Sequence, residues 1–487
     1  MIKWLRKNQS WLLFFLGIVC SLFFLLFNPF GLQPEACKTV AVAVLMVFWW
    51  ISEALPMPAV ALIPLVLLPL LGINKFEEVT KSYSNPVIFL FMGGFLIGLA
   101  IEKWNLHKRI SLQIIKATGT SGDRIILGFV IATGFISMWI SNTATTMMMF
   151  PIAVSVITVL KEHELNTKGF LNFSLVLMLV IAYASNFGGM GTIIGSPPNA
   201  AFVSYIEKKY GYTVQFLDWM LLCTPLAFTL MFCMYLVLTK ILFPNRIKSN
   251  KAAQDLIMGE IKALGKLTAS EKRVFAVFLI TALLWITKDF INKLEIIKLD
   301  DNMIAVMAAL TLFVIPAGKK QQHISKMLLE WKDTSKMAWG ILLLFGGGIA
   351  LASALEKVGV MEQIGNWLAG FSHPGSFTLV LIIIIISIFI SELMSNVAQV
   401  IVLTPVLVAL ADSMQFDPIF LGLPMALAAS SAAMMPTGTP PNAIVFGSGY
   451  VRLKDMLKAG FVLNLISITI IMIFSWFLLP HVMHFLK

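Results

Sequence analysis

Two short polar motifs interrupt long apolar stretches of the chain. They are built from neutral side chains and read Ser141-Asn142-Thr143 and Ser395-Asn396-Val397. Hydroxyl and carboxamide groups donate hydrogen bonds to carboxylate oxygens, and oxygen ligands suit hard cations such as sodium. These residue types are therefore candidates for holding a small anion and small cations in an apolar environment.

Two further motifs break apolar helices with paired prolines. The first runs from Gly188-Gly189-Met190-Gly191 through Gly195-Ser196-Pro197-Pro198-Asn199, and the second reads Pro436-Thr437-Gly438-Thr439-Pro440-Pro441-Asn442. Because proline cannot continue a helix, each motif unwinds the chain. Unwound backbone in a membrane persists only where it is buried in protein or lines a watery cavity. The N-terminal ends of half-helices favour anions, and unwound carbonyl groups favour small cations.

Fixed positive charge is missing around these motifs. Lys and Arg are absent from residues 125–160, 169–207 and 358–451. A substrate with two carboxylates would bring two negative charges into a medium that penalises isolated charge severely. Mobile cations must then neutralise the substrate, which favours cation-coupled anion uptake.

The composition explains why these motifs lie in apolar surroundings. The 487 residues are 58% hydrophobic and 13% charged, with a mean hydropathy of +0.87. Soluble domains carry roughly one-quarter charged residues, so a soluble enzyme, a disordered chain and a secreted disulfide scaffold are excluded. We also find no nucleotide-binding loop, H-E-x-x-H motif or nucleophile elbow. The sequence predicts a membrane protein with no enzymatic role and no cofactor.

Most of the apolar stretches have the length of a simple membrane span. Nine of them are predicted to cross once: 11–27, 37–54, 56–73, 86–102, 219–243, 274–290, 302–316, 337–355 and 459–485. Residues 171–206 and 418–449 are each predicted to cross once with an unwound middle. Residues 125–160 and 375–411 could each form two crossings joined by a three-residue polar turn, but their polar, uncharged centres fit re-entrant hairpins better. The fold class is thus an all-α polytopic membrane protein with eleven transmembrane helices and two re-entrant hairpins.

The basic residues orient this arrangement. The chain has a net charge of +11, and the segments predicted to lie inside hold 25 of its 36 Lys and Arg residues. This bias follows the positive-inside rule, so no nucleic-acid partner is needed to explain the charge. We expect a multi-pass protein of the cell membrane, surrounded by lipid, with a cytoplasmic N-terminus and an extracytoplasmic C-terminus.

An internal repeat supports the count. An offset of 254 residues superimposes the two Ser-Asn motifs, and an offset of 243 residues superimposes the two Pro-Pro-Asn motifs. Five predicted crossings separate the two hairpins, and an odd number inverts the second half. Inverted repeats with broken helices are typical of secondary transporters.

The chain resembles the divalent anion/sodium symporters, which include sodium-dependent dicarboxylate transporters. The resemblance is carried by both Ser-Asn motifs, both Pro-Pro-Asn breaks, Asn105-Leu106-His107-Lys108-Arg109-Ile110 and Glu53-Ala54-Leu55-Pro56. It implies a homodimer in which a scaffold holds the interface and a transport domain moves as an elevator. The scaffold would comprise 1–120 and, with an inside loop, 246–372. The transport domain would comprise 121–245 and 373–487.

The resemblance also implies the residues of the binding site. The substrate carboxylates would contact Ser141, Asn142, Thr143, Ser196, Pro197, Ser395, Asn396, Thr439 and Pro440. One sodium ion would be held by Ser137, Ser141, Asn142 and Gly195. The other would be held by Ser391, Met394, Asn396 and Gly438. One departure is Val397, which stands where many bacterial members have threonine and leaves the preferred substrate open.

The sequence therefore predicts a sodium-coupled symporter that imports C4-dicarboxylates such as succinate, malate or fumarate. A sodium-independent dicarboxylate exchanger and a sodium-coupled citrate or sulfate transporter of the same fold remain alternatives. An anion channel could also bind anions at helix ends, but its flux would not saturate as the anion concentration rises. A membrane-embedded enzyme is disfavoured because the motifs contain no nucleophile–base pair or metal cluster.

Overall fold

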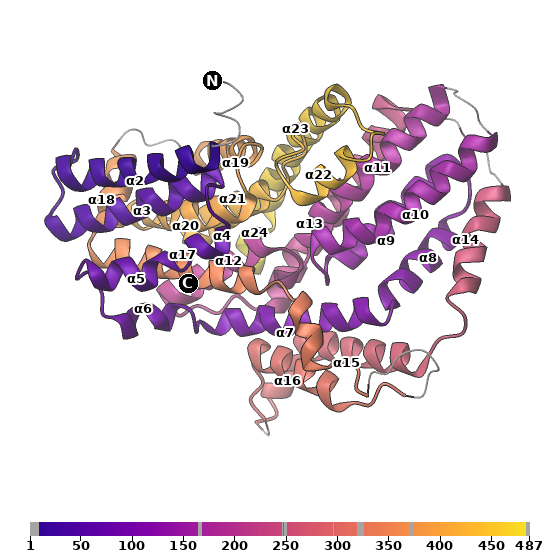
Figure 1. Cartoon of the computed structure of the whole chain (residues 1–487), viewed down its shortest axis with the longest axis horizontal. Helices are drawn as coiled ribbons and strands as arrows, with labels where there is room; N and C mark the ends of the chain where they lie inside the picture. The colour runs from indigo at the N-terminus through magenta and orange to yellow at the C-terminus, as the bar shows by residue number, and fades with distance from the viewer. Residues whose placement is uncertain are drawn as a thin grey trace.

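The computed structural model describes residues 9–163, 168–245, 247, 251–295, 297–318, 326–370 and 375–483. Within these ranges the regular structure is helical, apart from an isolated β-bridge between Pro316 and Met327. The basic start (1–8) and the end of the predicted span 459–485 lie outside the described residues. Figure 1 shows α8, α9, α10 and α11 side by side at one end of the molecule and α2 and α3 at the other.

The helices fall into two groups, one in each half of the chain. The first comprises α2 (Gln9–Phe27), α3 (Pro34–Ser52), α4 (Met57–Val60), α5 (Ile63–Leu70), α6 (Phe76–Ser82), α7 (Pro86–Lys103), α8 (Leu106–Thr118), α9 (Gly122–Ser137), α10 (Asn142–His163), α11 (Lys168–Gly189), η1 (Ile193–Gly195), α12 (Pro197–Tyr210), α13 (Phe216–Leu236) and η2 (Val237–Leu242). The second comprises α14 (Lys251–Ala263), α15 (Ala269–Asn292), α16 (Asp301–Val314), η3 (Trp331–Lys336), α17 (Trp339–Lys357), α18 (Val360–Ala369), α19 (Ser376–Ser391), α20 (Asn396–Ser413), α21 (Pro418–Ala429), α22 (Pro440–Phe446), α23 (Leu453–Phe477) and α24 (Leu479–Val482).

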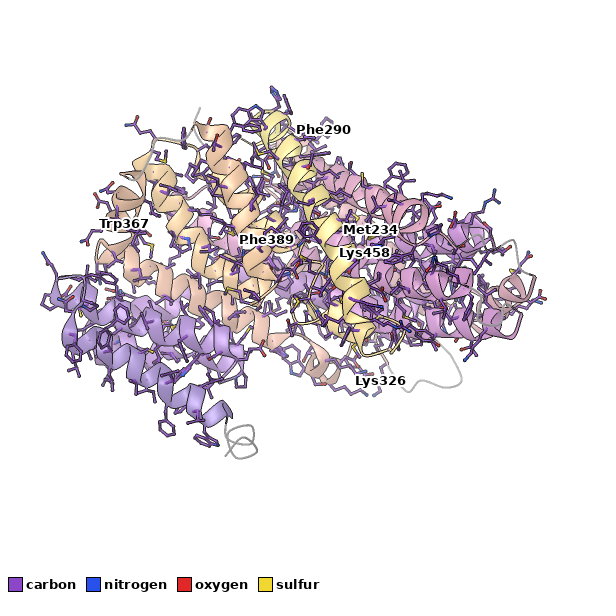
Figure 2. The ribbon with its side chains drawn as sticks, turned by 90° about the horizontal axis from the view of Figure 1, so that it is seen from above. Met234, Phe290, Lys326, Trp367, Phe389 and Lys458 are labelled. Carbon is purple, nitrogen blue, oxygen red and sulfur yellow. The ribbon has the colours of Figure 1, made fainter. Side chains whose placement is uncertain are left out.

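The helices have the length and surface of a membrane protein. Among the described residues, nine helices are long and apolar enough to cross a bilayer, and five shorter helices are also apolar. Large apolar side chains remain exposed on the periphery: Phe290 is 70% exposed and Trp367 is 63% exposed (Figure 2). Lipid can solvate such a surface and water cannot, so the chain is an all-helical membrane protein.

One predicted span differs in the structure. Residues 56–73 were expected to form a single crossing, but they form the two short helices α4 and α5. Pro64 has no N–H with which to continue the helical hydrogen bonds past Val60. Beyond it, Leu65 N donates to Leu62 O at 3.2 Å and not to Ala61 O, so the carbonyl oxygen of Ala61 accepts a hydrogen bond from the Tyr83 hydroxyl at 2.5 Å. The chain bends where this external donor replaces the helical one.

The helix pairs at the two polar motifs pack against both broken helices. The turn between α9 and α10 carries Ser141, and the turn between α19 and α20 carries Ser395. Helix α10 contacts α11 and α22, and α20 contacts α21 and α12. The chain between α11 and α12, and between α21 and α22, is therefore held against the two turns. This packing brings all four motifs into one region.

The two half-helices differ in how they are covered. Helix α12 contacts α7 and α17, and its residues 198–206 are all buried. Helix α22 packs against α10 and α11, and it leaves Pro440, Ala443 and the following Gly447 exposed. The half-helix α12 is thus covered by other helices, whereas part of the surface of α22 is exposed.

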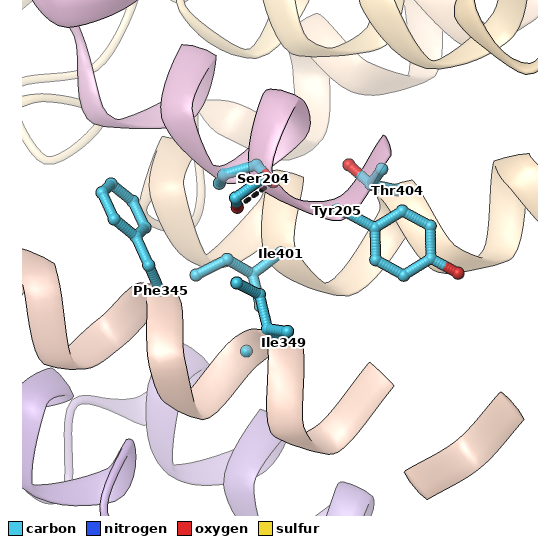
Figure 3. A pocket seen from close by; sticks show the side chains of 8 residues that line it. Ser204, Tyr205, Phe345, Ile349, Ile401 and Thr404 are labelled. Atoms are coloured by element: carbon cyan, nitrogen blue, oxygen red, sulfur yellow. Dashed lines mark hydrogen bonds between the residues drawn. The ribbon is translucent and has the colours of Figure 1, made fainter. Parts of the chain in front are cut away.

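A small cavity lies where α12 meets α17 and α20. Figure 3 shows it, with Ser204, Tyr205, Phe345, Ile349, Ile401 and Thr404 in its wall. Its free space is about 10 Å³, which is about the room that one water molecule needs. A dicarboxylate does not fit there, so the polar motifs and not this cavity are the candidate site.

Candidate functional site

Oxygen atoms converge on the side chain of Asn142 at the first turn. Its Oδ1 lies 2.8 Å from Ser137 Oγ, 3.1 Å from the carbonyl oxygen of Ser185 and 3.2 Å from that of Gly195. The Ser137 hydroxyl has a single proton to donate. Its oxygen lies 2.8 Å from Ser185 O and also 2.8 Å from Asn142 Oδ1. A cluster of four uncharged oxygens, one each from α9, α10, α11 and η1, matches the ligands that hard cations prefer. Three of these residues, Ser137, Asn142 and Gly195, were predicted to hold sodium.

Glycines allow this close approach. A Cβ added to Gly189 would lie 2.2 Å from Asn142 Oδ1, and one added to Gly195 would lie 2.6 Å from the carbonyl oxygen of Gly189. Separations this short do not occur between real atoms, so a side chain at either position would push the break away from the turn. Gly189 at the end of α11 and Gly195 in η1 therefore let backbone carbonyl groups reach Asn142.

The second turn repeats the arrangement of the first. Ser391 Oγ lies 2.7 Å from Asn396 Oδ1 and 2.6 Å from the carbonyl oxygen of Ala429. Ser391 is fully buried, whereas Asn396 is half-buried, as Asn142 is. Gly438 lies nearby, since a Cβ there would be 3.4 Å from the carbonyl oxygen of Ser391. The structure thus brings Ser391 and Asn396 together and places Gly438 beside the backbone carbonyl of Ser391 and the carboxylate of Glu392.

The other predicted residues surround these two clusters. Ser141 is half-buried, and its hydroxyl accepts a hydrogen bond from Ala144 N at 3.3 Å, so it caps α10. Thr143, Pro197, Met394 and Ser395 are half-buried, Ser196 and Thr439 are buried, and Pro440 is exposed. The two buried residues are the N-caps of α12 and α22.

The asparagines of the Pro-Pro-Asn motifs stabilise the breaks. Asn199 Nδ2 donates to the carbonyl oxygens of Gly189 at 2.9 Å and Thr192 at 2.8 Å. Asn442 Nδ2 donates to the carbonyl oxygen of Met435 at 3.1 Å. Each asparagine therefore folds back over the unwound segment that precedes its own half-helix. It replaces the helical partners which those carbonyl groups have lost.

The second break starts earlier than the sequence indicates. We expected it at Pro436, but α21 already ends at Ala429. Glu392 explains the difference: its carboxylate accepts hydrogen bonds from the backbone N–H groups of Ala433, Met434 and Met435, each at 2.9 Å. Asn464 Nδ2 adds a fourth donor at 2.8 Å. A buried carboxylate with four donors thus holds the unwound segment.

Two residues that the sequence analysis missed join the halves of the molecule. The Tyr183 hydroxyl on α11 donates to the carbonyl oxygen of Ala433 at 2.8 Å. Asn186, also on α11 and 3% exposed, donates from Nδ2 to Thr439 Oγ1 at 3.1 Å. The available signal was a carboxamide inside an apolar helix, three residues before Gly189. No repeat partner marks it: the offset of 243 residues aligns it with Ala429, and in the structure Ser430 holds the equivalent place, one residue after the carbonyl that Ser391 contacts.

Comparisons with known proteins give the chain its family. The family described as "Sodium:sulfate symporter transmembrane region" matches residues 7–482. The sodium-dependent dicarboxylate transporter SdcS of Staphylococcus saprophyticus is 39% identical over 464 residues, which are 94% of this chain and 89% of that protein. The transporter of the same name from Staphylococcus aureus (strain USA300) is 38% identical over the same shares.

A solved structure shares the fold alone. The YdaH transporter of Alcanivorax borkumensis has a TM-score of 0.50 at 11% sequence identity, over 82% of this chain and 87% of that one. The family match covers almost the whole chain and agrees with the motifs that the structure gathers. The chain therefore belongs to the divalent anion/sodium symporter family, and it is a multi-pass membrane transporter and not an enzyme.

Proposed function

We propose that the protein is a sodium-coupled symporter that imports C4-dicarboxylates such as succinate, malate and fumarate by alternating access. The observation that carries the proposal is the pair of oxygen clusters at Ser137–Asn142 and Ser391–Asn396, each completed by a backbone carbonyl. Two such clusters, one in each repeat, suit two sodium ions. The names of the curated relatives support both the coupling ion and the substrate class.

Charge balance explains why the ions accompany the substrate. The half-helices α12 and α22 begin beside the two turns, and their N-terminal ends favour the substrate carboxylates. No Lys or Arg occurs in the segments that form the turns and breaks, 125–160, 169–207 and 358–451. The dicarboxylate therefore binds with a favourable free energy only when sodium ions have brought compensating charge.

The substrate would lie between the two turns and the two half-helices. Its contacts would be Ser141, Asn142, Thr143, Ser196, Pro197, Ser395, Asn396, Thr439 and Pro440. The first sodium ion would lie at Ser137, Ser141, Asn142 and Gly195, with the carbonyl of Ser185 as an added ligand. The second would lie at Ser391, Met394, Asn396 and Gly438, with the carbonyl of Ala429 added. The half exposure of the two turns supports access from an open side.

The chain would cross the membrane eleven times, with α9–α10 and α19–α20 as re-entrant hairpins. The N-terminus would be cytoplasmic and the C-terminus extracytoplasmic. Residues 121–245 and 373–487 would form the moving transport domain, and 1–120 and 246–372 the scaffold of a homodimer. In this topology the exposed α22 faces the cytoplasm and α12 is covered by the scaffold helices α7 and α17, which is the arrangement of an inward-facing elevator.

A second candidate keeps the fold and changes the anion. The family takes its description from a sodium:sulfate symporter, and Val397 removes a hydroxyl from the second motif. Citrate or sulfate could then compete for the same clusters. A sodium-independent exchanger is disfavoured because it would need a fixed positive side chain where sodium is proposed.

Uptake into proteoliposomes tests the proposal. Labelled succinate should accumulate when sodium is present outside and should fall to background when choline replaces sodium. A panel of unlabelled dicarboxylates, citrate and sulfate then ranks the substrates. Undiminished uptake in choline would contradict sodium coupling, and strong competition by sulfate alone would contradict the substrate class.

A further inference from the structure

Asn186 connects the first turn to the second break. Its Oδ1 lies 3.5 Å from Asn142 Nδ2, and its Nδ2 donates to Thr439 Oγ1 at 3.1 Å. The side chain is 3% exposed, so water does not compete for these contacts. Three side chains from α10, α11 and the start of α22 thus form a continuous polar path through an apolar interior.

The carboxamide of Asn142 can adopt two orientations that occupy the same space. With Oδ1 directed at the cluster, it faces the oxygens of Ser137, Ser185 and Gly195. With the group turned by 180°, Nδ2 donates to these same three oxygens. A sodium ion in the cluster requires the oxygen, and without the ion the nitrogen satisfies the three acceptors. Sodium therefore decides which end of the group faces Asn186.

The orientation of Asn142 determines that of Asn186. With sodium bound, Asn142 presents Nδ2, which donates to Asn186 Oδ1, and Asn186 then directs its own Nδ2 at Thr439. With Asn142 turned, two oxygens would face each other. Turning Asn186 as well removes this repulsion, and it exchanges the 3.5 Å contact of Asn186 Nδ2 with Asn442 Oδ1 for a hydrogen bond from the Thr439 hydroxyl. A buried polar group left without a partner is strongly disfavoured, so the two carboxamides reorient together.

The reorientation changes the hydrogen bonds that the Thr439 hydroxyl makes. With sodium bound, its oxygen accepts hydrogen bonds from Asn186 Nδ2 at 3.1 Å and from Asn442 N at 3.3 Å. Its own proton is then free to be donated to a substrate carboxylate. In the turned arrangement Asn186 Oδ1 would take that proton, and the substrate would lose a donor. Sodium at the first turn therefore prepares a hydroxyl at the second break.

We propose that Asn186 is a positioning residue that transmits sodium occupancy at the first turn to the Thr439 hydroxyl, and through it to the substrate. This inference rests on the proposed function. The path connects the first turn to the second break, and the other repeat has no such asparagine. The equivalent position there is Ser430, which follows Ala429 as Asn186 follows Ser185. The Ser430 hydroxyl donates to Ala426 O within its own helix at 3.2 Å. The second sodium ion lacks an equivalent connection.

The matched variants are Asn186→Ala and Ser430→Ala, which alter equally buried positions related by the repeat. Succinate affinity of the purified protein is measured by calorimetry at limiting and at saturating sodium, and sodium binding alone is measured by thermal stabilisation. Asn186→Ala should still be stabilised by sodium. Its succinate affinity at saturating sodium should fall about fivefold to tenfold, and it should barely change at limiting sodium. Ser430→Ala should behave as the wild type.

A wild-type sodium dependence of succinate binding in Asn186→Ala would overturn the inference. Should that variant not fold, Thr439→Val removes the other end of the path and must show the same loss of sodium dependence; retention of that dependence would likewise overturn the inference. Different results would contradict the proposed function and this inference. A wild-type protein that binds succinate equally without sodium contradicts the proposed function, whereas an unaltered Asn186→Ala contradicts this inference alone.

Discussion

The rings of Phe91 on α7 and Phe345 on α17 meet edge to face, with their centroids 5.4 Å apart. The two residues occupy equivalent positions in the repeat that relates the Ser-Asn motifs. Equivalent residues touch each other where a two-fold axis passes between them. The contact agrees with a pseudo-symmetry axis that passes between α7 and α17, and a feature that one half shares with the other can be tested in both.

Replacing either carboxamide should abolish transport. In Asn142→Ala and Asn396→Ala, one oxygen cluster loses a ligand that no neighbour replaces. We expect sodium-dependent succinate uptake to fall to background in both variants, with unchanged membrane expression. Asn172→Ala, which removes a half-buried carboxamide on α11 that donates to Pro244 O, should transport normally. Near-normal uptake by either cluster variant would refute the placement of the ion sites.

The hydroxyl of Ser391 should act on sodium affinity and not only on stability. Ser391→Ala removes an oxygen that lies 2.7 Å from Asn396 Oδ1. The sodium concentration for half-maximal uptake should rise by about tenfold, which corresponds to one lost interaction of roughly 1.4 kcal/mol.

Ser387→Ala is the control for that variant. It lies one turn earlier on α19, equally buried, and its hydroxyl bonds Met425 O and Gln399. Sodium activation curves should separate the two variants, because Ser387→Ala should leave the half-maximal sodium concentration unchanged. Equal shifts in both would show that the effect is structural.

Neutralising Glu392 should loosen the second break. In Glu392→Gln, the new Nε2 would face a backbone N–H donor, which leaves a buried donor without a partner and costs about 1–3 kcal/mol. We expect the purified protein to unfold at a temperature a few degrees lower. Glu77→Gln, an exposed position on α6, should not change the unfolding temperature. An unchanged unfolding temperature in Glu392→Gln would show that its hydrogen bonds do not hold the segment.

A methyl group at Gly189 should displace Asn142. The added Cβ would lie 2.2 Å from Asn142 Oδ1, so the turn and the break must separate. We expect Gly189→Ala to lose sodium-dependent thermal stabilisation. Gly259→Ala on α14 meets nothing within 4 Å and should keep it. Sodium stabilisation of wild-type size in Gly189→Ala would contradict the close approach on which the first cluster depends.

The sequence predicted the parts of the site that depend on short motifs and on the internal repeat. Paired prolines located the start of α12 and of α22, and the repeat located Asn142 and Asn396. The distant partners were not predictable, because the carbonyls of Ser185 and Ala429 carry no side-chain signal. Glu392 has Met138 as its repeat partner, so symmetry concealed its role in lengthening the second break. The division of residues 56–73 depended on the distant hydroxyl of Tyr83.

Equilibrium binding tests the central claim, that sodium supplies the positive charge which the segments forming the site lack. Succinate is titrated into purified protein with sodium and with choline at equal ionic strength, and sodium is titrated with and without succinate. The account predicts that sodium tightens succinate binding and that succinate tightens sodium binding by the same factor, as linkage requires. Succinate binding of equal affinity in choline would contradict it.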